Sequence, residues 1–125
     1  MDRSKVQFQQ LEKAQAFLQR ALSAPEGELQ RAASIQAFEF CFELSWKYLK
    51  SLIEEDGRLA TSPKATFREA AQLGYIDNLE IWFEFLTARN LTVHTYIESI
   101  ADDVYQVIKN SFAPALKKLL ESTKP

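Results

Sequence analysis

Residues 29–55, LQRAASIQAFEFCFELSWKYLKSLIEE, decide the fold of this chain. Apolar side chains recur in it every three or four residues, the spacing that lines them up along one side of an α-helix. One stripe consists of Phe38, Cys41, Phe42, Ser45, Leu49 and Leu52, and a second of Phe40, Leu44 and Tyr48. Two apolar stripes predict a helix that is covered on two sides, by its own bundle and by a partner.

The short run FEFCF at residues 38–42 also alternates between apolar and polar residues, as a half-buried strand would. The residues on both sides of this run include Ala, Leu, Glu and Lys at helical spacing, and these residue types favour a helix. We therefore expect one long helix over residues 29–55 and no strand.

Few residues in the rest of the chain break a helix. The 125 residues include only 3 glycines and 4 prolines, too few for the many turns of an all-β fold. The breaks fall at residues 24–27, 56–63 and 74–78. We expect residues 1–125 to form a single domain of the all-α class, an up-and-down four-helix bundle with one additional short helix.

The other helices are predicted from their caps and stripes. The first should cover residues 4–22. In the short helix, Ser62 should cap the N-terminus, Pro63 should take the first position, and Gly74 should end it. The fourth should open at Asp77, with Glu80 completing a capping box. Its expected stripe is Leu79, Trp82, Phe83, Leu86 and then Val93, and the expected stripe of the last helix is Ile97, Ile100, Ala101, Val104, Ile108, Phe112 and Leu119.

Two features of the last two helices are less regular. Pro114 should bend the last helix, because proline lacks the amide hydrogen that an α-helix needs. The β-branched residues between 92 and 97 weaken helix propensity where the two helices join. A continuous helix, a kink and a turn all fit this junction.

Charge and cysteine content restrict the classes of function. The net charge of −2 provides no general attraction to nucleic acid, so RNA contact would need a local basic patch. The single cysteine excludes an internal disulfide and fits a reducing compartment. The first residues, MDRSKVQFQQ, lack the apolar segment of a signal peptide, and no run is long enough to span a membrane. We expect a cytoplasmic protein.

One polar group interrupts the apolar pattern of the fourth helix. At about 100° per residue its stripe passes through Asn90, with Arg89 and His94 on the two borders. Asn90 and His94 are four apart, and Arg89 and Tyr96 are seven apart, so each pair shares a face. If these side chains meet in a groove, the site offers a guanidinium for phosphate, an imidazole for proton transfer, an amide and a phenol.

Such a set suits cleavage of a ribose–phosphate linkage. The imidazole can take the proton of a 2′-hydroxyl, and the guanidinium can stabilise the charge of the phosphorane. Cleavage without a metal needs both a base and an acid, but the chain has one histidine. Either a second copy supplies its His94 across a two-fold axis, or another group such as Tyr96 acts. The structural alternative is a buried, hydrogen-bonded histidine and an arginine that pairs with a carboxylate.

Other candidate residues point to structural roles. Glu39 and Glu43 are expected to face solvent or to pair with Lys47. Cys41 lies in an apolar stripe and is expected to be a small buried residue. The chain has one histidine and one cysteine without ligand-like spacing, so we expect no metal site. It also lacks a glycine-rich phosphate loop, so we expect no cofactor.

The segment RNLTVHTY, residues 89–96, resembles the Arg-x4-6-His signature of the HEPN superfamily in the form Arg-Asn-x3-His-x-Tyr. The blocks AFEFCFELSWKYLK (37–50) and SPKATFREAAQLGYID (62–77) and the stretch 82–96 are similar to the nucleotidyltransferase substrate-binding protein family, the HepT-like toxin branch of HEPN. The resemblance covers nearly the whole chain, in the expected order.

This resemblance implies a HEPN-like helical bundle that dimerises and has a minimal nucleotidyltransferase as its partner. In such toxin–antitoxin pairs the HEPN member is a metal-independent ribonuclease with an RNA substrate. Arg89 and His94 would be catalytic, with Asn90 the polar residue that follows the arginine. Tyr96 matches the tyrosine that related antitoxins modify with AMP, and an added phosphate would place negative charge against Arg89.

Two alternatives to a ribonuclease remain at this stage. The chain could be a non-catalytic substrate-binding or regulatory subunit of a two-component nucleotidyltransferase. It could also be a plain helical interaction module in which the motif only satisfies polar groups at a seam of the bundle. Whether the chain is an enzyme is therefore open from sequence.

Overall fold

The computed structural model describes residues 3–125, and within that range it is helical without strands. The elements are α1 (Arg3–Ser23), α2 (Glu28–Glu55), α3 (Pro63–Gln72), α4 (Leu79–Leu91), the 3-10 turn η1 (Thr92–His94), α5 (Glu98–Val107), the π-helical turn η2 (Ile108–Phe112) and α6 (Ala113–Ser122). α5, η2 and α6 follow one another without a break and form one long C-terminal helix. The predicted all-α class is confirmed.

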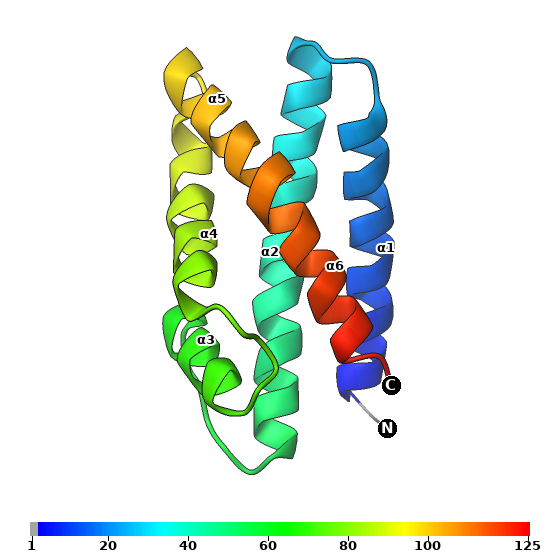
Figure 1. Ribbon diagram of the computed structural model, residues 1–125, viewed down its shortest axis with the longest axis vertical. Coiled ribbons are helices and arrows are strands. Elements are labelled where there is room, and N and C mark those ends of the chain that lie inside the picture. Colours follow the sequence, from blue (N-terminus) through cyan, green and yellow to red (C-terminus); the bar gives the residue numbers. More distant parts are fainter. Residues whose placement is uncertain (1–2) are drawn as a thin grey trace.

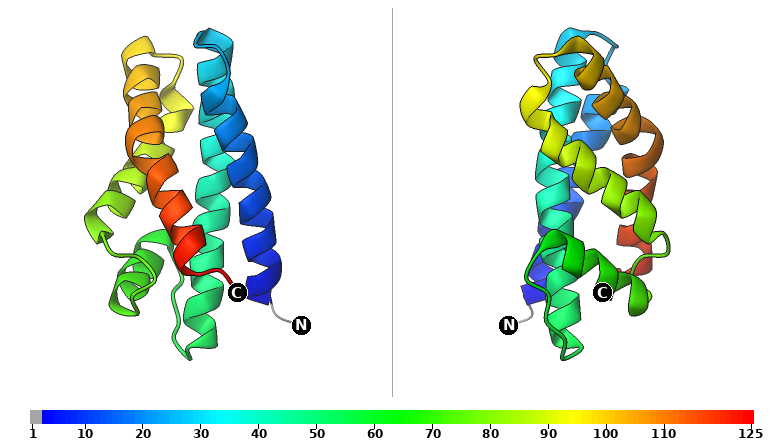
Figure 2. Two further views of the ribbon diagram at one scale, coloured as in Figure 1. Left: turned by 45° about the vertical axis from the view of Figure 1, so that its right-hand side comes forward. Right: turned by 90° about the vertical axis from the view of Figure 1, so that its left-hand side faces the viewer.

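The long helices run alternately up and down, as Figure 1 shows. α1 rises, α2 descends beside it, α4 rises, and the C-terminal helix descends to end near the first turn of α1. α3 lies across the lower end, against α2 and α4, as the turned views in Figure 2 also show. This is the predicted up-and-down bundle with one additional short helix.

Buried apolar side chains from every helix form one connected core. Its centre is a group of aromatic rings that meet edge to face, the geometry that their quadrupoles favour. The Phe112 ring lies 4.8 Å from that of Phe38, 5.1 Å from that of Phe85 and 6.1 Å from that of Trp82, centroid to centroid. Phe112 thus joins the C-terminal helix to both α2 and α4.

The two predicted stripes of α2 differ in burial. Every member of the first stripe is buried except Leu52, which is half-buried. In the second stripe Tyr48 is buried and Leu44 half-buried, but Phe40 is 51% exposed. The bundle therefore covers nearly all of one side of α2 and leaves part of the other side open around Phe40.

The capping predictions are confirmed for α3. The Ser62 side chain accepts a hydrogen bond from the amide of Ala65 at 3.2 Å, and Pro63 is the first residue of the helix. Gly74 follows the C-terminus at φ +84°, in the left-handed region that glycine adopts without a steric cost.

Substituting Ser62→Ala should lower the free energy of unfolding by about 1 kcal/mol, because the amide of Ala65 loses its acceptor. Urea denaturation followed by circular dichroism measures this difference. Thr61→Ala, at the exposed neighbouring position, is the matched control and should change stability by less than about 0.5 kcal/mol. Equal losses in the two variants would show that the cap contributes nothing.

The predicted start of α4 at Asp77 was wrong. Asn78 is the N-cap, and its side chain accepts a hydrogen bond from the amide of Ile81 at 3.1 Å. Asp77 instead pairs with Lys118 of α6, which holds the pKa of that carboxyl below its usual value. Asparagine caps a helix as well as aspartate does, and the lysine lies nearby only after the chain has folded.

The buried face of α4 is also turned from the predicted one. Trp82, Phe85 and Ala88 are buried, while the other predicted members Leu79, Phe83 and Leu86 are half-buried at its sides. Val93 is 65% exposed, because the α-helix ends at Leu91 and the stripe cannot continue through a 3-10 turn.

The junction after α4 is a turn, the third of the arrangements that fitted the sequence. The hydroxyl of Thr92 lies 2.8 Å from the carbonyl oxygen of Arg89, and the hydroxyl of Thr95 donates to the carbonyl of Thr92 at 3.0 Å. A side chain that bonds to nearby backbone, as Thr95 does, competes with helix continuation. The π-helical turn η2 directly precedes α6, where Pro114 cannot donate the amide bond of an α-helix.

Candidate functional site

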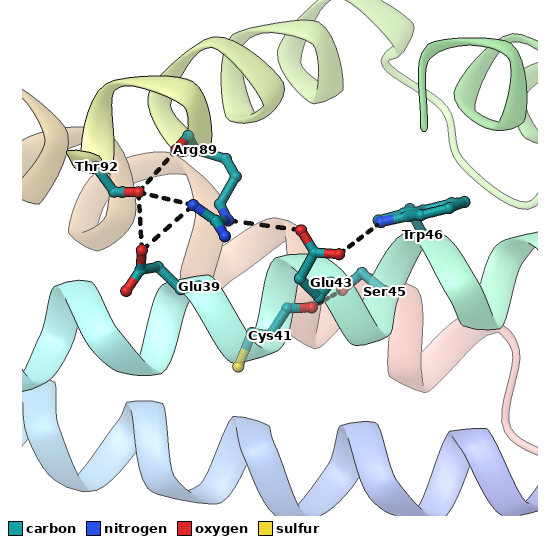
Figure 3. Close-up of polar contacts among 7 residues, drawn as sticks. All are labelled: Glu39, Cys41, Glu43, Ser45, Trp46, Arg89 and Thr92. Carbon is teal, nitrogen blue, oxygen red and sulfur yellow. Dashed lines mark hydrogen bonds and ion pairs between the residues drawn. The ribbon is translucent and has the colours of Figure 1, made fainter. Parts of the chain in front are cut away.

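Arg89 lies in the last turn of α4, and its side chain extends across to α2. As Figure 3 shows, Nη1 donates to Oε2 of Glu39 at 3.3 Å and to the hydroxyl of Thr92 at 2.9 Å. On the other side, Nε lies 3.6 Å from Oε1 of Glu43, within ion-pair range but beyond a hydrogen bond. The guanidinium is therefore held from two sides. We call Arg89, Glu39, Glu43 and Thr92 the arginine cluster.

The two glutamates share one face of α2 because they are four residues apart. Their side chains are 33% and 42% exposed, and that of Arg89 is 28% exposed. Glu43 also accepts a hydrogen bond from the indole nitrogen of Trp46 at 3.1 Å. The expectation for Glu39 and Glu43 was right in part: both side chains are partly exposed, but their carboxylates pair with Arg89 of α4.

Thr92 is a member of the cluster that sequence reasoning missed. It is 7% exposed, and its hydroxyl lies 2.9 Å from Oε2 of Glu39 while accepting from Arg89. Its position three residues after Arg89 was a usable signal, because residues three apart are neighbours on a helix. Its β-branched side chain alone indicates only a weaker helix at this position.

His94, Tyr96 and Asn90 are exposed. Nδ1 of His94 lies 3.4 Å from the Tyr96 hydroxyl, and the two rings meet edge to face with 6.0 Å between centroids. Tyr96 is 80% exposed and follows the turn η1. Histidine and phenol thus lie together on the surface at the end of α4.

Within one chain, the structure groups the predicted site residues into two sets. Arg89 bonds to the arginine cluster, and His94 contacts Tyr96. Over residues 3–125 no hydrogen bond or ion pair joins Arg89 to His94 or to Asn90. The assignment of Arg89, His94 and Asn90 as catalytic residues therefore stays a prediction.

The electrostatics of the cluster affect anion binding. One guanidinium faces two carboxylates, so the three groups together carry a net charge of −1 when ionised. An open groove of about 550 Å³ between α2 and α5 adjoins the cluster and is lined by Glu39, Thr92, Thr95 and Arg31, among others. A phosphate that enters this region would compete with carboxylates for Arg89.

Cys41 lies on α2 between the two glutamates but faces the core. It is fully buried, and burial raises the pKa of its thiol to about 12. A thiol with such a pKa stays protonated at neutral pH, so it is a poor nucleophile. The prediction of a small buried residue is confirmed.

Comparison with known proteins identifies the family. A family described as nucleotidyltransferase substrate binding protein like matches residues 6–125, nearly the whole chain. The chain belongs to this family. The resemblance inferred from the three sequence blocks is therefore confirmed, together with its HepT-like character.

Individual proteins are also similar to this chain. A Haemophilus influenzae protein called probable ribonuclease HepT is 37% identical over 82 residues, which are 62% of this chain and 56% of the relative. The match thus spans just over half of that curated relative. A crystal structure of a Thermus thermophilus protein has a TM-score of 0.84 at 31% identity and covers 92% of this chain and 99% of its own.

A second solved structure, from Haemophilus influenzae, is described as revealing the fold of a substrate binding domain of a nucleotidyltransferase. It matches with a TM-score of 0.81 at 27% identity, over 94% of this chain and 99% of its own.

None of the helices in residues 3–125 has the length and apolar character needed to cross a membrane.

Proposed function

We propose that this protein is the HEPN-type partner of a minimal nucleotidyltransferase and a metal-independent ribonuclease that acts through Arg89 and His94. One observation carries the proposal: an anchored arginine and an exposed histidine lie at the same end of α4, five residues apart, in a chain of the HepT-like family. The toxin role follows from the same family resemblance.

The chemistry uses groups that are present at the end of α4. His94 would take the proton of a ribose 2′-hydroxyl, whose oxygen attacks the adjacent phosphorus. The bond from phosphorus to the 5′-oxygen breaks, and that oxygen receives a proton. Arg89 would stabilise the charge on the phosphorane, which needs a guanidinium near the equatorial oxygens. The products are a 2′,3′-cyclic phosphate and a 5′-hydroxyl.

A second copy of the chain would supply the missing acid or base. Three large apolar residues close in sequence to members of the arginine cluster are exposed: Phe40 follows Glu39, Val93 follows Thr92, and Ile97 comes soon after, at 51%, 65% and 41% exposure. Large apolar side chains left exposed near a candidate site suggest an interface. A two-fold contact over this surface would bring two copies of the motif together, so we propose a homodimer.

Tyr96 is the proposed site of control by the partner nucleotidyltransferase. Its hydroxyl is accessible, and it lies 3.4 Å from the histidine nitrogen. Attack of this hydroxyl on the α-phosphate of ATP would release pyrophosphate and leave AMP on the ring. The added phosphodiester and nucleoside would block His94 and repel an RNA phosphate.

A cleavage assay tests this proposal. The purified chain with a single-stranded RNA should yield cyclic-phosphate ends in the presence of EDTA, and incubation with the partner and ATP should add one AMP and suppress cleavage. The Tyr96→Phe variant is the control: it should accept no AMP and should continue to cleave RNA when the partner is present. Intact RNA under all conditions would contradict a ribonuclease, and cleavage lost with EDTA would contradict a metal-independent one.

The pairing of Arg89 with two carboxylates favours one alternative function. In this alternative the protein is a non-catalytic substrate-binding or regulatory subunit of a two-component nucleotidyltransferase. The negative charges of Glu39 and Glu43 offset the positive charge of Arg89, and the whole chain carries a net charge of −2, so neither attracts an RNA phosphate strongly. In that case the protein would leave RNA intact, while His94→Ala would change only the affinity for the partner or for a nucleotide.

A further inference from the structure

We propose that Glu39 is a positioning residue: its carboxylate, together with Thr92, fixes the orientation of the Arg89 guanidinium for phosphate. This inference rests on the proposed ribonuclease function and extends it to a residue outside the Arg-x4-His motif, 50 positions earlier in the chain. It follows from the contacts of the arginine cluster, which Figure 3 displays.

The first argument is geometric. Oε2 of Glu39 lies 3.3 Å from Nη1 of Arg89 and 2.9 Å from the hydroxyl of Thr92, which itself lies 2.9 Å from Nη1. The three atoms form a closed triangle of contacts. A guanidinium with a single carboxylate partner can rotate about that contact, but one held by two mutually bonded groups cannot move independently of them.

The second argument is the rigidity of the support. Glu39 directly follows Phe38, which is fully buried and packs against Phe112, and Cys41 two positions later is also fully buried. The carboxylate therefore projects from a helix that is firmly packed on both sides of it in sequence. Site residues that are held within about 0.5 Å of a productive geometry need such support from a well-packed element.

The third argument concerns the side of the guanidinium that remains available. Both hydrogens on Nη1 are directed to Glu39 and Thr92, and Nε is buried against Glu43. Of the five N–H groups of an arginine, this leaves the two on Nη2 for a phosphate oxygen. Glu43 is held in turn by the indole of Trp46, so Nε is confined as well.

An orienting role of Glu39 and an effect of its charge predict different kinetic results. A nearby carboxylate weakens the attraction of Arg89 for a phosphate, so Glu39 cannot act by raising RNA affinity. Its contribution should appear in kcat, since displacement of a group by about 1 Å can reduce a rate by up to about 100-fold. Removal of its charge alone should not weaken RNA binding.

The experiment compares Glu39→Ala and Glu39→Gln with wild-type protein in steady-state cleavage of a single-stranded RNA. Glu39→Ala should lower kcat by about 10- to 100-fold with KM within about twofold. Glu39→Gln keeps an oxygen that accepts from Nη1, so it should recover at least about tenfold of the lost kcat, with KM equal to or below that of wild type. Glu12→Ala, an exposed glutamate on α1, is the matched control.

Two further measurements separate positioning from folding. Thermal melts should place all variants within a few degrees of wild type, because Glu39 is only half-buried. In NMR spectra of arginine-labelled protein, assigned with Arg89→Lys, the side-chain N–H signal of Arg89 should be sharp in wild type and broadened or averaged in Glu39→Ala.

The outcomes are distinguishable from those that test the proposed function. Wild-type protein that leaves RNA intact refutes the ribonuclease and the positioning role together. An active wild type with Glu39→Ala equally active, or with an unchanged Arg89 signal, refutes positioning alone. A Glu39→Gln variant as inactive as Glu39→Ala also refutes it, because the role would then depend on charge.

Discussion

Replacing His94 with alanine is expected to reduce RNA cleavage by about 10²- to 10⁴-fold, the usual contribution of a general acid or base. No other histidine in the chain can take its place. The fold should persist, because His94 is exposed, and the only hydrogen-bond or ring partner of its side chain among residues 3–125, Tyr96, is exposed as well. Cleavage is measured by gel on a labelled RNA, and the fold by circular dichroism and a thermal melt.

Lys13→Ala is the control for His94→Ala, since it removes another exposed ionisable group on the distant helix α1. It should cleave RNA at the wild-type rate. Unchanged cleavage in His94→Ala would eliminate the proposed mechanism. A parallel loss of stability in that variant would instead support the plain interaction module, in which the motif only satisfies polar groups.

The largest effect on stability is expected at Phe112. Phe112→Ala should lower the free energy of unfolding by about 3–5 kcal/mol, because it removes a fully buried ring that contacts aromatic rings of both α2 and α4. The π-helical turn that carries Phe112 has little freedom to close the resulting cavity, since core side chains pack tightly around it. Urea denaturation followed by tryptophan fluorescence measures this loss.

Leu59→Ala is the control for a truncated apolar side chain at the surface, where Leu59 is 82% exposed. It should alter stability by less than about 0.5 kcal/mol. A loss of about 3–5 kcal/mol is a large part of the roughly 5–15 kcal/mol that folds a typical domain. If Phe112→Ala were as stable as Leu59→Ala, the ring would not hold the C-terminal helix to the bundle.

Local features of the fold could be predicted because they depend on residues a few positions apart. The stripe from Phe38 to Leu49 and the cap at Ser62 are set by helical spacing and by one side-chain bond to a nearby amide. The family followed from sequence blocks of the same kind. Features at the helix ends were harder, since Asp77 and Asn78 are both good caps and only the contact with Lys118 separates them.

The candidate site was predicted in part. The exposed pair His94 and Tyr96 are two residues apart, and their proximity is a local property. The spacing of residues along α2 could not show that Glu39 and Glu43 hold Arg89. Along that helix Lys47 is the nearer potential partner of Glu43. The two glutamates meet Arg89 only because α2 and α4 pack side by side in the bundle.

By itself, the sequence determined the number and order of the helices, the buried side of α2 and the family. It also placed Arg89, Asn90, His94 and Tyr96 close together in the chain at one end of α4. Only the tertiary structure decided that Arg89 turns toward Glu39 and Glu43 while His94 faces outward. The physical reason is that spacing along a helix settles which residues share a face. The rotation and depth at which two helices pack, which arise from the whole core, settle which faces meet.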